Sequence, residues 1–295
     1  YNVDAGKDTG ETTVRPHITV AFTDDGNPGP DAKQVGEQRL TTTRVFGILV
    51  DKVNDAPEVD PAHNEATIDS DHEDEATDGD DVYPHFKSVE ALVSQAFVDA
   101  KDDQTSKGST KGTLSDELIG ILVKETKATS AQGVWQYSTD DGENWTAITA
   151  GTYLANDVDI RFLPKDNWNG TPGKLIVHLV ENDLNTDSTG NQDWVTGNTY
   201  STADKDIGGT TRVSKDTVAI GTVVTPVNDA PEFKTLEVSI TQPEDSTAKL
   251  GANNSYAKTI SALVSNAMFK DDTDQVSGGS TKDSFWGIAI VGGVE

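Results

Sequence analysis

Several short segments of the chain alternate between apolar and polar residues, which is the pattern of strands with one buried face. The clearest examples cover residues 17–22, 158–162 and 175–179, and Gly, Asn, Asp or Pro lies beside each of them. Many short strands separated by regular turn signals are typical of a β-sandwich. We therefore expect an all-β fold.

One segment follows a helical period instead. The i, i+3, i+4, i+7, i+8 spacing of a single helix face is occupied by Val89, Leu92, Val93, Ala96 and Phe97. The same spacing returns later in the chain, at Ile260, Leu263, Val264, Ala267 and Met268. The spacing predicts a short helix of two or three turns in each copy.

The sequence repeats itself over a long distance. The motif VNDAPE at residues 53–58 recurs unchanged at 227–232, a spacing of 174. Residues 87–111 align without a gap on residues 258–282, a shift of 171. Further on, Gly120-Ile121 is matched by Gly287-Ile288. Matches in one order at nearly one spacing identify a tandem array of modules.

The register of this array divides the chain into three parts. Residues 57–230 are expected to form one complete repeat module, residues 1–56 the C-terminal part of a preceding module, and residues 231–295 the N-terminal part of the next. Each partial module then needs a partner. We expect the two partial modules to pair with each other, with a neighbouring chain, or with flanking sequence.

Charge and composition exclude several classes of function. The chain carries 50 acidic and 23 basic side chains, a formal net charge of −27, so a nucleic-acid partner is excluded and an anionic membrane surface is disfavoured. No apolar run reaches the roughly 20 residues of a membrane helix, so we expect no membrane insertion. The chain has no cysteine, which excludes disulfides and thiolate chemistry.

Acidic residues gather at predicted loops and strand ends, near residues 24–25, 69–81, 99–103, 181–187 and 271–274. Closely spaced carboxylates repel one another, and hard divalent cations take oxygen ligands of this kind. A solvated acidic surface explains any single run equally well. However, Glu73 returns as Glu244 and Asp103 as Asp274, both at the shift of 171. This recurrence favours metal sites.

The repeated VNDAPE motif resembles the linker of cadherin-like domains, where an Asn-Asp pair ligates calcium between successive β-sandwiches. Residues 23–28 are similar to the strand-end motif T-D-x-G-x-P of that family. The resemblance implies Ca2+ as cofactor. Together with the acidic clusters it gives these expected ligands: Asp24, Asn54, Asp55, Glu73, Asp102, Asp103, Asp183, Asn228, Asp229, Glu244, Asp272 and Asp274. The sequence departs from the family in its longer module and in Thr225, which stands where the first linker has Asp51.

A closer resemblance is to the tandem repeats of giant bacterial repeats-in-toxin adhesins exported by type I secretion. It rests on residues 134–145, on residues 160–171 and on the VNDAPE motif, which together span most of the complete module. It implies tandem Ig-like or cadherin-like β-sandwich modules with a short helix each, in a calcium-stiffened stalk or fibre at the extracellular cell surface. The expected partners are neighbouring modules or identical subunits. A module that binds a glycan or another cell-surface ligand, and a self-assembling extracellular filament subunit, are the alternatives.

Other motifs favour structure over chemistry. Residues 138–145 fit the Asp-box pattern S-x-D-x-G-x-x-W once only, which predicts a structural hairpin. The five tryptophans could stack on sugars, but core packing is the simpler interpretation. His178 lies in an alternating segment and is expected at a strand surface. Because HExxH, GxSxG, Walker and GxGxxG motifs are absent, we do not expect an enzyme.

Overall fold

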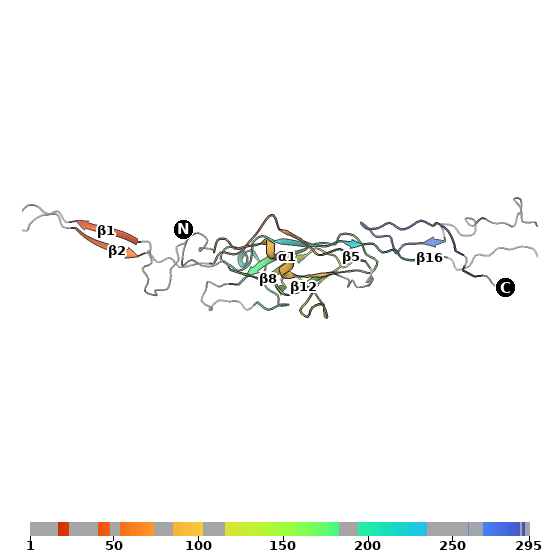
Figure 1. Ribbon diagram of the computed structural model, residues 1–295, viewed down its shortest axis with the longest axis horizontal. Coiled ribbons are helices and arrows are strands. Elements are labelled where there is room, and N and C mark those ends of the chain that lie inside the picture. The colour runs from red at the N-terminus through yellow and green to blue at the C-terminus, as the bar shows by residue number, and fades with distance from the viewer. Residues whose placement is uncertain are drawn as a thin grey trace, which may run out of the picture.

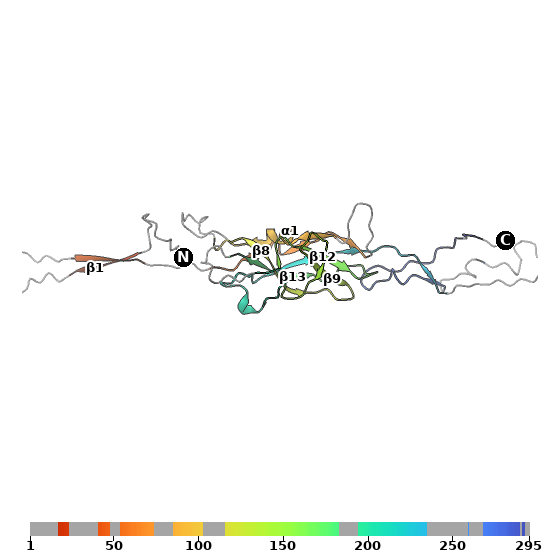
Figure 2. The same ribbon diagram turned by 90° about the horizontal axis from the view of Figure 1, so that it is seen from below.

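The computed structural model describes residues 17–23, 41–47, 54–73, 85–102, 116–182, 194–234, 259, 268–289 and 291–292. Within these ranges the regular structure is almost entirely β, with one five-residue α-helix and two 3-10 turns. The predicted all-β class is confirmed. Figures 1 and 2 show the described parts following one long axis, with β1 and β2 toward one end and β16 toward the other.

Most strands belong to residues 57–230, which we call the central unit. Its strands are β3 (Glu58–Val59), β4 (Glu65–Thr67), β5 (Asp71–His72), β6 (Phe86–Ser88), β7 (Phe97–Val98), β8 (Leu118–Thr126), β9 (Gly133–Ser138), β10 (Thr146–Ala147), β11 (Tyr153–Ala155), β12 (Asp159–Pro164), β13 (Leu175–Glu181), β14 (Val218–Gly221) and β15 (Val224–Thr225). Outside it lie β1 (His17–Thr23), β2 (Thr41–Gly47), β16 (Glu232–Phe233) and β17 (Phe269–Lys270). Strands were expected over three of these segments, and β1, β12 and β13 lie there.

Two sheets enclose the main core of the central unit. One has four strands in the order β10-β9-β12-β6, and the other has five in the order β11-β8-β13-β14-β4. All pairs in these sheets are antiparallel except β14 with β4. Trp135 and Phe162 from the first sheet share one buried cluster with Ile121 and Leu179 from the second. Residues of both sheets therefore contribute to one hydrophobic core.

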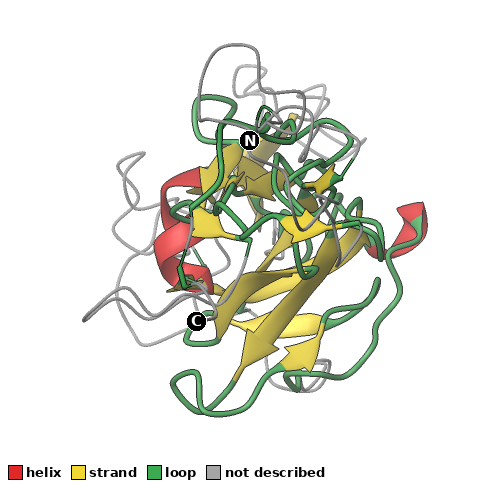
Figure 3. Cartoon of the chain, turned by 90° about the vertical axis from the view of Figure 1, so that its right-hand side faces the viewer, coloured by secondary structure: helices red, strands yellow, loops and turns green. Residues whose placement is uncertain are grey.

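The helical spacing is realised as a short helix in the central unit. The helix α1 (Val89–Val93) begins at Ser88, whose side chain accepts a hydrogen bond from the Ala91 amide at 3.3 Å. The 3-10 turn η1 (Ser94–Ala96) follows, and Phe97 already belongs to β7. Figure 3 shows the helical segments at the outside of the strands. The matching positions 260–267 of the next copy lie outside the described residues.

The strand β13 is buried on both faces, which corrects the expectation for His178. This strand lies in the middle of the five-stranded sheet, and every one of its residues is buried. Its second face is covered by a smaller cluster that includes Tyr153, Val180 and Val213. The His178 side chain is completely buried, and neither ring nitrogen has a hydrogen-bond partner among the described residues. Burial lowers the pKa of His178.

The Asp-box segment closes the hairpin between β9 and β10. The Ser138 hydroxyl donates to Asp140 at 2.7 Å, and Asp140 accepts from the Asn144 amide at 2.8 Å. The Trp145 ring packs against Phe86 and lies under the Arg161 guanidinium, 4.0 Å from its centroid. The Asp-box segment therefore stabilises a hairpin in this fold, as the single copy of the motif predicts.

The buried imidazole of His178 generates a pH prediction. A base whose pKa is lowered by folding takes up its proton more readily in the unfolded chain, so its contribution is lost as pH falls below about 6.5. Chemical denaturation between pH 7.5 and 5.5 should show the wild type losing stability relative to His178→Leu, by at most about 1.4 kcal/mol per pH unit. Parallel pH profiles for the two proteins would contradict this.

Candidate metal centre

Two groups of three aspartates lie in corresponding places of the repeat. The first triad is Asp99, Asp102 and Asp116; the second triad is Asp271, Asp274 and Asp283. Within each triad, one carboxylate oxygen per residue lies within 4.8 Å of the others. Each group has the residue types and spacing to hold a metal ion.

The first triad forms where the linker, the end of β7 and the start of β8 meet. We call the VNDAPE motif at residues 53–58 the first linker and the one at 227–232 the second linker. Strand β7 pairs with β3, which begins at the end of the first linker, so the residues after β7 lie beside that linker. The Asp55 amide donates to Asp102 at 3.0 Å. The Asp116 amide, just before β8, donates to Asp99 at 2.5 Å. Backbone hydrogen bonds thus hold three separate segments around the carboxylates.

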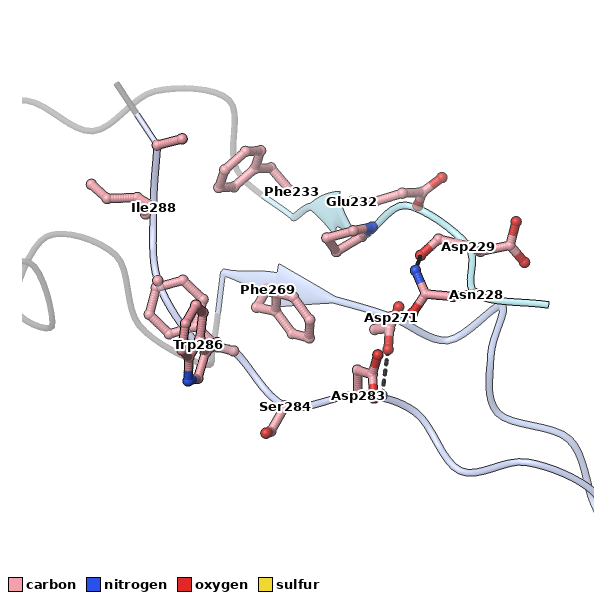
Figure 4. Close-up of a pocket in the computed structure, with 14 residues that line it drawn as sticks. Asn228, Asp229, Glu232, Phe233, Phe269, Asp271, Asp283, Ser284, Trp286 and Ile288 are labelled. Carbon is pink, nitrogen blue, oxygen red and sulfur yellow. Dashed lines mark hydrogen bonds between the residues drawn. The ribbon is translucent and has the colours of Figure 1, made fainter. Parts of the chain in front are cut away.

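The second triad repeats this arrangement in the segment that follows the central unit. Strand β17 pairs with β16, which begins at the end of the second linker. The Asp229 amide donates to Asp274 at 3.0 Å, and the Asp283 amide donates to Asp271 at 2.5 Å. Figure 4 shows Asp229, Asp271 and Asp283 together at one side of a pocket of about 580 Å³. The repeat is therefore structural as well as sequential.

The paired ladders also correct the sequence alignment by one residue. Glu58 lies opposite Val98 in the first ladder, and Glu232 lies opposite Lys270 in the second. This register makes Asp102, and not Asp103, the counterpart of Asp274. The ungapped alignment, with its shift of 171 residues, paired Asp103 with Asp274 because the two residues are identical. The strand pairing instead shows which aspartate lies beside the linker in each copy.

The first triad is buried together with a fourth acidic side chain. Glu181, at the end of β13, is completely buried, and Asn54 donates from Nδ2 to its Oε1 at 3.0 Å. Burial raises the pKa of Glu181 to about 9, and the neighbouring charge of Asp99 adds to the effect. Burial likewise raises the pKa of Asp99 to about 6. Ionised carboxylates at this place destabilise the fold unless a positive charge joins them.

Three buried oxygens around the first triad have no hydrogen-bond partner among the described residues. They are Oδ1 of Asn54, Oδ1 of Asp99 and Oε2 of Glu181. Buried polar atoms are nearly always paired, and leaving one unpaired costs about 1–3 kcal/mol. Oxygens of this kind are ligands that a bound cation would take. The donor set consists of oxygen only, which fits a hard cation.

Two of the sequence-predicted ligands are members of the triads, Asp102 of the first and Asp274 of the second. Three more lie beside the triads: the backbone amides of Asp55 and Asp229 donate to Asp102 and Asp274, and Asn54 donates to Glu181. Asn228 lines the pocket beside the second triad.

Two other predicted ligands lie elsewhere. Asp272 is outside the second triad and lies 3.9 Å from Lys282. Glu73 is at the opposite end of the central unit from Asn54, where its oxygens accept from the Val227 amide at 2.7 Å and Asn169 Nδ2 at 2.8 Å. The remaining four lie outside the described residues: Asp24, Asp103, Asp183 and Glu244.

Sequence reasoning missed four members of the triads, namely Asp99, Asp116, Asp271 and Asp283. Their signals are present in the chain. The spacing D-x-x-D occurs at 99–102 and again at 271–274. Asp116 and Asp283 are 167 residues apart, the same distance that separates the two Gly-Ile pairs. Glu181 was also missed as a candidate ligand, because only the fold brings the end of β13 to the linker.

No family model, curated protein or solved structure matches the chain. In the ranges that the structure describes, no helix has the length and apolar character to cross a bilayer.

Substitution of Glu181 is expected to raise the stability of the cation-free protein and to lower its affinity for the cation. Replacing Glu181 with Gln keeps the acceptor for Asn54 and removes a carboxyl whose pKa is raised by burial, so Glu181→Gln should stabilise the chelator-treated protein at pH 7 by about 1–3 kcal/mol. The same change should weaken cation binding at the first triad. Thermal unfolding in EDTA and calorimetric Ca2+ titration measure the two effects. Destabilisation in EDTA, or unchanged binding, would contradict the role given to Glu181.

Proposed function

We propose that this chain is a calcium-binding structural segment of a secreted, tandemly repeated surface protein, in which Ca2+ stiffens the joints between modules. The observation that carries the proposal is the construction of one acidic triad twice, each beside an Asn-Asp linker and each with the same two backbone hydrogen bonds. The triads lie at the start of the central unit and at the start of the segment after it.

Calcium is the cation that this donor set favours. Carboxylates, an Asn carbonyl and nearby backbone groups match a cation that takes about six to eight oxygens in irregular geometry. Magnesium demands a near-ideal octahedron and retains its waters, which suits a loop-built site less well. Three or more carboxylates at one place also favour a divalent over a monovalent ion, because the divalent ion neutralises more of their charge.

The mechanical role follows from which segments meet at a triad. In each joint the amide of the linker aspartate is held by a triad carboxylate, Asp55 by Asp102 and Asp229 by Asp274. A cation on the triad cancels the repulsion between carboxylates and holds the loop after β7 or β17 in place. The linker is then fixed relative to that loop, and the angle between modules becomes defined.

We infer further that each module is a cadherin-like β-sandwich. Two largely antiparallel sheets that share one core support this assignment. The repeated linkers before and after the central unit support it as well. The proposal places the chain outside the cell, where millimolar calcium suits sites of modest affinity. The role proposed is that of a stalk or fibre at the cell surface, with neighbouring modules as partners, and it involves no catalysis.

Calcium should raise the melting temperature of the protein. A ligand that binds only the folded state stabilises it by about 2.7 kcal/mol at one hundred times its dissociation constant. Differential scanning calorimetry in EDTA and in millimolar CaCl2 checks this, with MgCl2 at equal ionic strength as the control. Coincident melting curves in EDTA and calcium would overturn the proposal.

The two sites should be separable by mutation. Asp102→Asn and Asp274→Asn each keep the acceptor for the linker amide and remove one ligand charge, so each should lower the Ca2+ stoichiometry in isothermal titration calorimetry. Asp272→Asn is the matched control, because Asp272 is an equally acidic neighbour outside the second triad. Loss of calcium in the control to the same extent as in Asp274→Asn would show that bulk charge, and not the triad, attracts the ion.

A further inference from the structure

The central unit and the segment that follows it also meet through a contact outside the second triad. Asn169, in the loop between β12 and β13, is buried. Its Nδ2 donates to Glu73 at 2.8 Å and to the Ser280 hydroxyl at 2.8 Å, while its Oδ1 accepts from the Ser280 amide at 2.7 Å. One buried amide therefore joins the central unit to the segment that follows it.

Glu73 orients this amide and the linker together. Its side chain is buried, one oxygen accepts from Asn169, and the other accepts from the amide of Val227 in the second linker. A carboxylate that accepts from Nδ2 fixes which way the Asn169 amide points. Glu73 thus acts here as a positioning residue for the joint.

The partner of Asn169 is a tight turn at residues 276–280. Two backbone hydrogen bonds close it, from the Val276 amide to Ser280 at 3.0 Å and from the Gly279 amide to Val276 at 3.1 Å. Gly278 has a φ of +83°, a conformation that favours glycine. At Gly279 an added Cβ would lie 2.2 Å from Oδ1 of Asn169. The turn therefore fits against Asn169 only when position 279 has no side chain.

This turn is connected to the second triad. The Ser280 hydroxyl donates to the Asp274 carbonyl at 2.5 Å, and the Asp274 carboxylate holds the Asp229 amide. Asp274 and Asp283 lie on either side of the turn in the chain. A cation that orders these two aspartates also restricts the turn that docks onto Asn169.

We infer that Asn169 and Glu73 form a docking surface for the glycine turn of the following module, and that docking and cation binding at the second triad reinforce each other. The docking rests on the contacts above alone. The reinforcement rests also on the proposed function, and by linkage it acts in both directions.

Hydrogen exchange at the Ser280 amide tests the docking without any cation. In EDTA the Ser280 amide should be protected in the wild type, and Asn169→Ala and Gly279→Ala should each speed its exchange by about ten-fold or more. Asp166→Ala, an exposed change in the same loop as Asn169, is the matched control. Protection of the β13 amides reports that the central unit is still folded. Unchanged Ser280 exchange in both variants, with β13 protected, would overturn the docking.

Calcium titration tests the reinforcement. In a background of Asp102→Asn, which leaves the second triad as the site observed, Gly279→Ala should weaken Ca2+ binding about five-fold or more. Gly279 lies outside the triad, so the variant removes no triad carboxylate. Equal affinity with and without Gly279→Ala would overturn the reinforcement while the exchange result still decides the docking. Absence of calcium binding in the wild type would instead refute the proposed function.

Discussion

The burial of several carboxylates at one place is the constraint on which the joints of this protein depend. The first triad and Glu181 are buried beside the first linker, and burial raises the pKa of Asp99 and Glu181. Charged groups in such a place destabilise a fold unless they are neutralised. A divalent cation bound at the triad, as we propose, would resolve that conflict at the point where the linker meets the loop after β7.

The rest of the central unit positions this cluster. The ladder of β3 with β7 brings the linker to the first two aspartates, and the start of β8 supplies the third. The antiparallel ladder of β8 with β13 places Glu181 opposite Leu118, two residues after Asp116, so Glu181 reaches the same place. At the opposite end, Glu73 and Asn169 receive the next segment. The unit thus presents an acidic joint at one end and a hydrogen-bonded joint at the other.

Periodicity predicted the local structure well where one face of an element is buried. The alternation at residues 158–162 and the helical spacing from Val89 to Ala96 correspond to β12 and to the helical segments. His178 was placed wrongly because residues 194–213, which cover the second face of β13, carry no regular pattern that ties them to it. Whether an irregular segment covers the outer face of a strand is decided by the tertiary fold and cannot be read from the periodicity of that strand.

The sequence repeat predicted where the candidate metal site lies better than it predicted which residues form the site. The linker residues and Asp102 and Asp274 lie at the triads, but identity alone aligned the loop one residue out of register. Glu73 was expected as a ligand from the cadherin-like resemblance and from its recurrence, and in the structure its oxygens accept from the Val227 amide and from Asn169. Sequence gives the charge of a side chain, and only the fold decides which partner it meets.

The most direct test of the account is the distance between two modules with and without calcium. The chain has no cysteine, so Ala150→Cys in the central unit and Ala289→Cys in the next segment, both at exposed positions, give a unique pair of spin labels. Double electron–electron resonance should show one narrow distance distribution in millimolar CaCl2 and a broader one in EDTA. Equal widths in both conditions would contradict the claim that the cation fixes the joint.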